Sequence, residues 1–107
     1  MTYEEIVEYA RKEFLKKDVS SYKGHLAVQF NITGEGEGAF YVEVKDGQTF
    51  VEPYEYYDRD AIFTASAKTF LGIADGSVNP VRAFTFGKLK IDGSIEKSLE
   101  FQKVFCE

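Results

Sequence analysis

Residues 75–93 read DGSVNPVRAFTFGKLKIDG, and this stretch specifies a helix, a strand and the turns around them. Gly76 ends a preceding helix, because glycine readily adopts the positive φ found at helix C-termini. Asn79 and Pro80 begin a new helix, since an Asn side chain caps the first N–H groups and Pro suits the first helical position. Residues 88–92 then alternate polar and apolar side chains. This alternation predicts a half-buried strand.

The residues before this stretch predict one helix and a run of strands. Thr2 and Glu5 have the spacing of a capping box, and the apolar side chains that follow, as far as Phe14, fall on one helical stripe. Four segments have the period of a strand, namely residues 25–33, 39–45, 48–52 and 61–66. The Asp46-Gly47 pair predicts a tight hairpin, and we expect Phe50 in the strand after it to enter the core.

Two further helices complete the chain. Residues 67–74 form an apolar helical segment, and residues 94–105 are amphipathic with a wide apolar arc. This order of elements predicts an α+β fold in which a sheet turns one face toward helices. At 107 residues, with no linker or repeat, we expect residues 1–107 to be a single domain.

The motif in residues 75–93 also resembles a known signature. Its form, Asp-Gly, then Asn-Pro-Val-Arg-Ala-Phe, then Gly-Lys-Leu-Lys-Ile and a final Gly, is similar to that of the sterol carrier protein 2 family. The resemblance extends over nearly all of the chain. It implies a five-stranded, mostly antiparallel sheet with helices on one face and an apolar tunnel between the layers. It also implies binding of a fatty acid, fatty acyl-CoA, sterol or phospholipid without catalytic residues or a cofactor.

One set of apolar residues is the candidate lining of that tunnel. Periodicity alone would assign these residues to a core, because a core and a dry pocket use the same residue types. The family resemblance favours a cavity that binds lipid. The set consists of Phe63, Phe70, Leu71, Ile73, Val81, Phe84, Leu89, Ile91, Ile95, Leu99 and Phe105.

The net charge and the cysteine content limit the kinds of binding partner and the cellular compartment that we expect. A net charge of −5 with no basic stripe argues against nucleic acid and against strong attraction to an anionic membrane, although transient membrane contact stays open. Cys106 is the only cysteine, so no internal disulfide can form. We expect Cys106 to pack as a small apolar side chain on the last helix, and a reactive or intermolecular thiol is the alternative. We expect a cytoplasmic protein, because no secretory signal or membrane span is visible. We expect a monomer or a weak dimer.

Other candidate sites have simpler interpretations. His25 is the only histidine and begins a strand, so we expect a structural role. Asp58 and Asp60 lie in a loop without further ligands nearby, and we expect no metal site. Residues 54–57 include three tyrosines, which could form the rim of a pocket, an interaction patch or an ordinary packed loop.

Two alternative functions remain open from the sequence. One is an accessory or dimerising module that binds no ligand. The other is a small isomerase-type enzyme that pairs a Tyr hydroxyl with a buried carboxylate. The sequence places every Asp and Glu in a loop, on a polar helix face or on an outer strand face, which argues against the enzyme.

Overall fold

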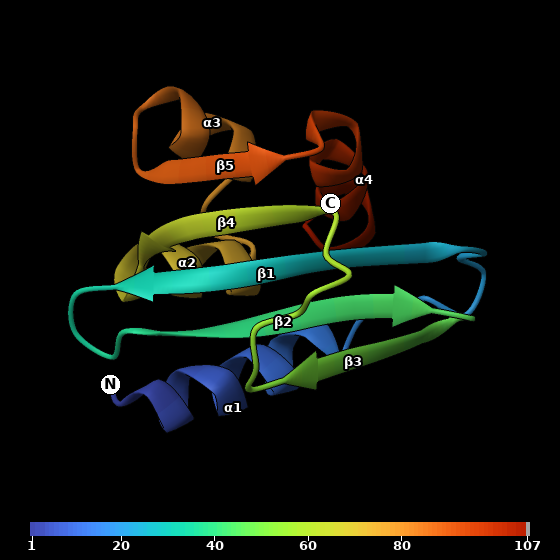
Figure 1. Ribbon diagram of the computed structural model, residues 1–107, viewed down its shortest axis with the longest axis horizontal. Coiled ribbons are helices and arrows are strands. Elements are labelled where there is room, and N and C mark those ends of the chain that lie inside the picture. The colour runs from blue at the N-terminus through green and yellow to red at the C-terminus, as the bar shows by residue number, and fades with distance from the viewer. Residues whose placement is uncertain (107) are drawn as a thin grey trace.

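The computed structural model describes residues 1–106, which form one five-stranded sheet and four helices (Figure 1). The helices are α1 (Tyr3–Phe14), α2 (Ala67–Asp75), α3 (Pro80–Thr85) and α4 (Ile95–Phe105). The strands are β1 (His25–Thr33), β2 (Gly38–Lys45), β3 (Gln48–Glu52), β4 (Ala61–Ser66) and β5 (Leu89–Gly93). Each element corresponds to a segment predicted from the sequence, and the α+β class is confirmed.

The sheet has the strand order β3-β2-β1-β4-β5. Phe30 in the central strand β1 lies opposite Phe40 of β2 and Phe63 of β4. The β1–β4 pair is parallel and the other neighbouring pairs are antiparallel. Parallel strands require a crossover connection. Residues 53–60 complete this connection by crossing the face of the sheet opposite the helices (Figure 1).

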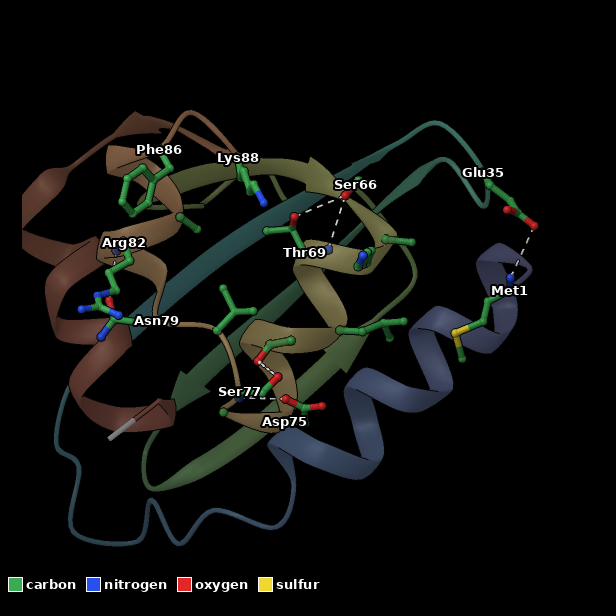
Figure 2. A pocket seen from close by; sticks show the side chains of 17 residues that line it. Met1, Glu35, Ser66, Thr69, Asp75, Ser77, Asn79, Arg82, Phe86 and Lys88 are labelled. Carbon is green, nitrogen blue, oxygen red and sulfur yellow. Dashed lines mark hydrogen bonds and ion pairs between the residues drawn. The ribbon is translucent and has the colours of Figure 1, made fainter.

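The core lies between the sheet and helices α1, α2 and α4, which cover one face (Figures 1 and 2). At its centre is a cluster of seven buried phenylalanines, here called the phenyl cluster. Ring centroids of neighbouring members lie 4.7–6.2 Å apart, many in the edge-to-face arrangement that aromatic rings favour. The members are Phe14, Phe30, Phe40, Phe63, Phe70, Phe101 and Phe105.

The ends of the helices follow the local sequence signals. Thr2 and Glu5 form the predicted capping box at α1. Gly76 ends α2 with φ of 87°, in the left-handed region where glycine is favoured. Asn79 Oδ1 accepts hydrogen bonds from the backbone N–H of Val81 at 2.8 Å and of Arg82 at 3.2 Å. These caps fix the point at which α3 begins.

The expectation for Phe50 is wrong. Phe50 pairs across from Glu43 on the outer face of the sheet and is 38% exposed. Because side chains alternate along a strand, its neighbour Val51 is the β3 residue buried beneath the helices. A five-residue strand with apolar residues at adjacent positions does not reveal by itself which of them faces the core.

Candidate functional site: a groove between helices α2 and α3

An open groove of about 1530 Å³ lies on the helical side of the molecule, between α2 and α3 (Figure 2). It begins near the N-terminus of α2 and follows that helix to the turn that joins α2 to α3. The far wall is α3 with the start of β5. Its lining residues are Met1, Glu35, Ser66, Ala67, Lys68, Thr69, Leu71, Gly72, Asp75, Gly76, Ser77, Val78, Asn79, Arg82, Ala83, Phe86 and Lys88.

Apolar side chains from both helices and from the turn line much of this groove, among them Leu71, Val78 and Phe86. The turn folds back on α2, and the Val78 N–H donates to the Gly72 carbonyl at 2.9 Å. Position 72 must be small, because a Cβ there would lie 2.3 Å from Val78 Cγ2. The close contact between α2 and the turn therefore depends on glycine at this position.

Three cations border the groove, namely Lys68, Arg82 and Lys88. Figure 2 shows Lys88 beside the start of α2 and Arg82 beneath Phe86 on the α3 wall. None of the three forms an ion pair with another side chain in residues 1–106. Their charges are therefore available to an anionic group in the groove.

The two carboxylates in the lining are already engaged. Asp75 accepts from the Ser77 backbone N–H at 2.8 Å and from the Tyr9 hydroxyl at 3.4 Å. The hydrogen bonds from Ser77 lower the pKa of Asp75, so this side chain is an anion at neutral pH. Glu35 pairs with the N-terminal amine of Met1 at 3.6 Å. The groove thus offers an apolar floor together with cations that no carboxylate neutralises.

The predicted lining residues are spread over the molecule. Leu71 is the one member that borders the groove. Five members are buried in the core, namely Phe63, Phe70, Ile73, Leu89 and Phe105. Ile91 is half-buried and packs against that core. Four members are exposed by 43–54%, namely Val81, Phe84, Ile95 and Leu99. Contact of these residues with a ligand stays a prediction.

The expected tunnel is not confirmed. The layer between the sheet and the helices, where it was placed, is filled by the phenyl cluster, and the groove lies outside that layer. Phe101 and Phe105 bring α4 into contact with Phe14 of α1, which closes the layer at this point.

Sequence reasoning missed most of the groove. Val78 and Phe86 lie outside α2 and α3, so helical periodicity does not identify them. No sequence pattern marks these positions: that α3 buries Pro80 and Ala83 and leaves its bulkier residues at the surface is decided by tertiary packing.

The outer face of the sheet holds a second cluster of polar groups. Glu43 is only 7% exposed, and its Oε2 lies 2.5 Å from His25 Nε2 and accepts a hydrogen bond from the Tyr56 hydroxyl. The hydrogen bond to Glu43 raises the pKa of Tyr56, and burial raises it further. The Tyr56 ring stacks on Tyr41 with centroids 4.2 Å apart. These contacts hold the segment between β3 and β4 against the sheet.

The tyrosine segment therefore combines packed and exposed side chains. Tyr56 is packed, and its backbone N–H donates to Gln29 Oε1 at 3.0 Å. Tyr54 and Tyr57 are exposed by 63% and 98%. Asp60, which follows them, accepts from the Ala27 N–H at 2.9 Å and so has a structural role. Within residues 1–106, no group of three or more His, Cys, Asp or Glu side chains could hold a metal ion.

The fold and the groove define a class of protein: a small α+β domain whose sheet is covered on one face by helices, with an open apolar groove among them. A model of the SCP-2 sterol transfer family matches residues 8–106. The chain belongs to this family. Membership supports a lipid-binding role and confirms the resemblance seen in residues 75–93.

Relatives and solved structures agree with this assignment. Sterol carrier protein 2 from Arabidopsis thaliana is 33% identical over 97 residues, which cover 84% of this chain and 79% of that protein. Hydroxysteroid dehydrogenase-like protein 2 from Mus musculus is 30% identical over 80 residues, 74% of this chain and 16% of that protein. The structure of palmitated SCP2L2 from Aedes aegypti superposes with a TM-score of 0.70 at 19% identity, covering all of this chain and 96% of the other.

Some relatives are much longer than this chain. The matched region spans only 16% of the mouse dehydrogenase-like protein and 13% of sterol carrier protein 2 from Homo sapiens. The fold also occurs within a sec-alkylsulfatase from Pseudomonas sp., with a TM-score of 0.71, 16% identity and coverage of 89% of this chain and 15% of the other. Among residues 1–106, no helix has the length and apolar character required to cross a bilayer.

Proposed function

We propose that this chain binds an elongated hydrophobic ligand, such as a fatty acid, fatty acyl-CoA, sterol or phospholipid, without catalysing a reaction. We assign the site to the groove between α2 and α3. The observation that carries this assignment is the apolar floor of the groove beside three unpaired cations, in a molecule whose layer between sheet and helices is already filled.

The driving force for binding would be burial of apolar surface. Each methylene removed from water contributes about 0.8 kcal/mol, so a long acyl chain would supply roughly 10 kcal/mol before the costs of association. Phe86, which is 76% exposed, would lose contact with water when a ligand covers it. A carboxylate or phosphate at the end of the ligand would lie within reach of cations such as Arg82 and Lys88.

The outer-face cluster does not favour the isomerase alternative. Such an enzyme needs a carboxylate that can reach its substrate. The Oε2 atom of Glu43 already contacts both His25 and Tyr56, so it is occupied by side chains of the protein itself. The groove also lies on the opposite side of the sheet from this carboxylate. Proton transfer at Glu43 is therefore a weaker hypothesis than simple binding.

Titration with a fluorescent fatty acid would test the groove. We expect saturable binding by the unmodified protein and at least tenfold weaker binding by Leu71→Lys, because the substitution places a charge on the apolar floor. Leu15→Lys is the matched control, since Leu15 is 54% exposed and does not line the groove. Equal affinity of the folded Leu71→Lys protein would show that the ligand binds elsewhere, and no binding by the unmodified protein would favour the accessory module.

A further inference from the structure

The segment between β3 and β4 presents aromatic side chains to solvent on the face of the sheet opposite the helices (Figure 1). Tyr54 and Tyr57 are exposed by 63% and 98%, and Phe50 of β3 is exposed by 38%. Phe50 pairs across from Glu43, which contacts Tyr56 of the segment, so Phe50 borders the segment. Exposed aromatic side chains gathered in one place are typical of interaction surfaces.

The same segment is anchored where it crosses the sheet. The Tyr56 hydroxyl donates to Glu43, and the Tyr56 backbone N–H donates to Gln29 Oε1 at 3.0 Å. Arg59 Nη1 donates to the Tyr56 carbonyl at 3.0 Å, and the Tyr56 ring stacks on Tyr41. Because Tyr56 is fixed, the residues beside it are held in place before any partner arrives. A partner that contacts them would lose little affinity to the ordering of this backbone.

Each exposed tyrosine of the segment is followed directly by a carboxylate. Glu55 follows Tyr54, and Asp58 follows Tyr57, with no Lys or Arg in residues 54–58. Glu55 and Asp58 are exposed and form no ion pair with another side chain in residues 1–106. Arg59, the nearest cation along the chain, donates to a backbone carbonyl instead. The two carboxylates are therefore available to a cation from another molecule.

The guanidinium group of arginine suits a surface of this composition. It stacks on aromatic rings, and it forms paired hydrogen bonds with a carboxylate. A tyrosine with a carboxylate beside it offers both contacts to one arginine side chain. We call this surface the acidic tyrosine surface and define it as Phe50, Tyr54, Glu55, Tyr57 and Asp58.

We propose that the acidic tyrosine surface binds an arginine-containing segment of another protein. A nucleic acid is a poorer occupant, because Glu55 and Asp58 would repel its phosphates. A second copy of this surface is also a poorer occupant, because pairing would bring the unpaired carboxylates of both copies together. The groove lies on the helical side of the sheet, so this interaction goes beyond the proposed function and does not depend on a lipid ligand.

Fluorescence polarisation with two labelled peptides would test the proposal. One is an eight-residue peptide in which arginine alternates with glycine, and the other has lysine at each arginine position. We expect the arginine peptide to bind at least fivefold more tightly, because lysine has the same charge but lacks the planar fork that stacks and forms paired hydrogen bonds. Equal binding of the two peptides would indicate attraction by net charge alone and would overturn the proposal, as would no binding of the arginine peptide.

Two variants would locate the contact. Tyr57→Ser should weaken binding of the arginine peptide about fivefold through the lost ring, and Glu55→Gln about threefold through the lost charge. Both side chains are exposed, so we expect the melting temperatures to be unchanged. Neither residue lines the groove, so both variants should also keep the fatty-acid affinity of the unmodified protein.

Matched controls lie on other surfaces. Glu37→Gln removes an exposed carboxylate before β2 and changes the net charge by the same amount as Glu55→Gln. Phe84→Ser removes a ring of α3 that is 48% exposed. We expect both controls to bind the arginine peptide as the unmodified protein does. If they weaken binding as much as Glu55→Gln and Tyr57→Ser, the acidic tyrosine surface is not the contact. Sedimentation-equilibrium analysis showing a dimer that Tyr57→Ser dissociates would overturn the proposal in favour of a second copy.

Discussion

Tyr22 joins two segments that are far apart in the sequence. Its hydroxyl donates to Glu100 Oε1 at 2.7 Å, which links the chain after α1 to helix α4. Burial and the hydrogen bond to Glu100 raise the pKa of Tyr22 to about 12, above the ordinary value of 10.0. The favoured state in the folded protein is thus the neutral phenol. The stabilisation that the neutral Tyr22 phenol provides is fully present below pH 10 and is lost as the pH rises toward 12.

Replacement of Tyr22 by Phe would test this link. We expect Tyr22→Phe to lower the free energy of unfolding by about 1 kcal/mol at pH 8, because one hydrogen bond is lost. We expect the difference from the unmodified protein to shrink between pH 10 and pH 12. Urea unfolding measured across this pH range is the appropriate assay.

The control for this experiment is Tyr57→Phe, which changes a side chain that is 98% exposed. It should leave stability unchanged at pH 8. A Tyr22→Phe protein whose deficit stays constant up to pH 12 would contradict the proposed role of the phenol.

At the scale of elements, α3 is the part of the fold that depends most on its cap. Helix α3 has only six residues, and Asn79 Oδ1 accepts hydrogen bonds from two of the first backbone N–H groups of the helix. Short helices have few internal hydrogen bonds, so the cap and the contacts with β5 must hold α3 in place.

Asn79→Ala should therefore lower the free energy of unfolding by about 1 kcal/mol. Because α3 forms one wall of the groove, we also expect weaker fatty-acid binding. Thermal unfolding and the fluorescent titration would measure the two effects. Asn79→Ser is the conservative control, since Ser also caps helices, and it should restore most of both properties. Full stability of the Asn79→Ala protein would show that the contacts with β5 suffice.

At the scale of the whole molecule, a ligand bound in the groove and a ligand bound in the expected tunnel would contact different residues. A ligand in the groove would contact Leu71 and Phe86 and leave the phenyl cluster undisturbed. A ligand between the layers would have to displace rings such as Phe30 and Phe101, whose centroids are 5.8 Å apart.

Nuclear magnetic resonance during a palmitate titration would distinguish these sites. We expect chemical-shift changes at Leu71 and Phe86, with much smaller changes at Phe30 and Phe101. We also expect the melting temperature to rise with palmitate concentration, because a ligand that binds only the folded state stabilises it. Large shifts at Phe30 and Phe101 would place the ligand between the sheet and the helices and would revive the tunnel.

The sequence determined the elements of this protein and their ends. Periodicity separates helices from strands because the two repeat at 3.6 and 2 residues, and caps such as Asn79 act through neighbours in the chain. The motif in residues 75–93 also indicated the family to which the chain belongs. All of these signals are local, so they can be read without knowing what packs against each element.

Only the tertiary structure decided how the apolar residues are used. An apolar stripe shows that a side chain avoids water, but whether it meets other side chains, a groove or a partner depends on elements distant in sequence. Phe63 enters the phenyl cluster because β4 pairs with β1, while Phe84 stays exposed because Ala83 takes the buried side of α3. The parallel β1–β4 pair and the position of the groove likewise arise from long-range packing, which no local pattern encodes.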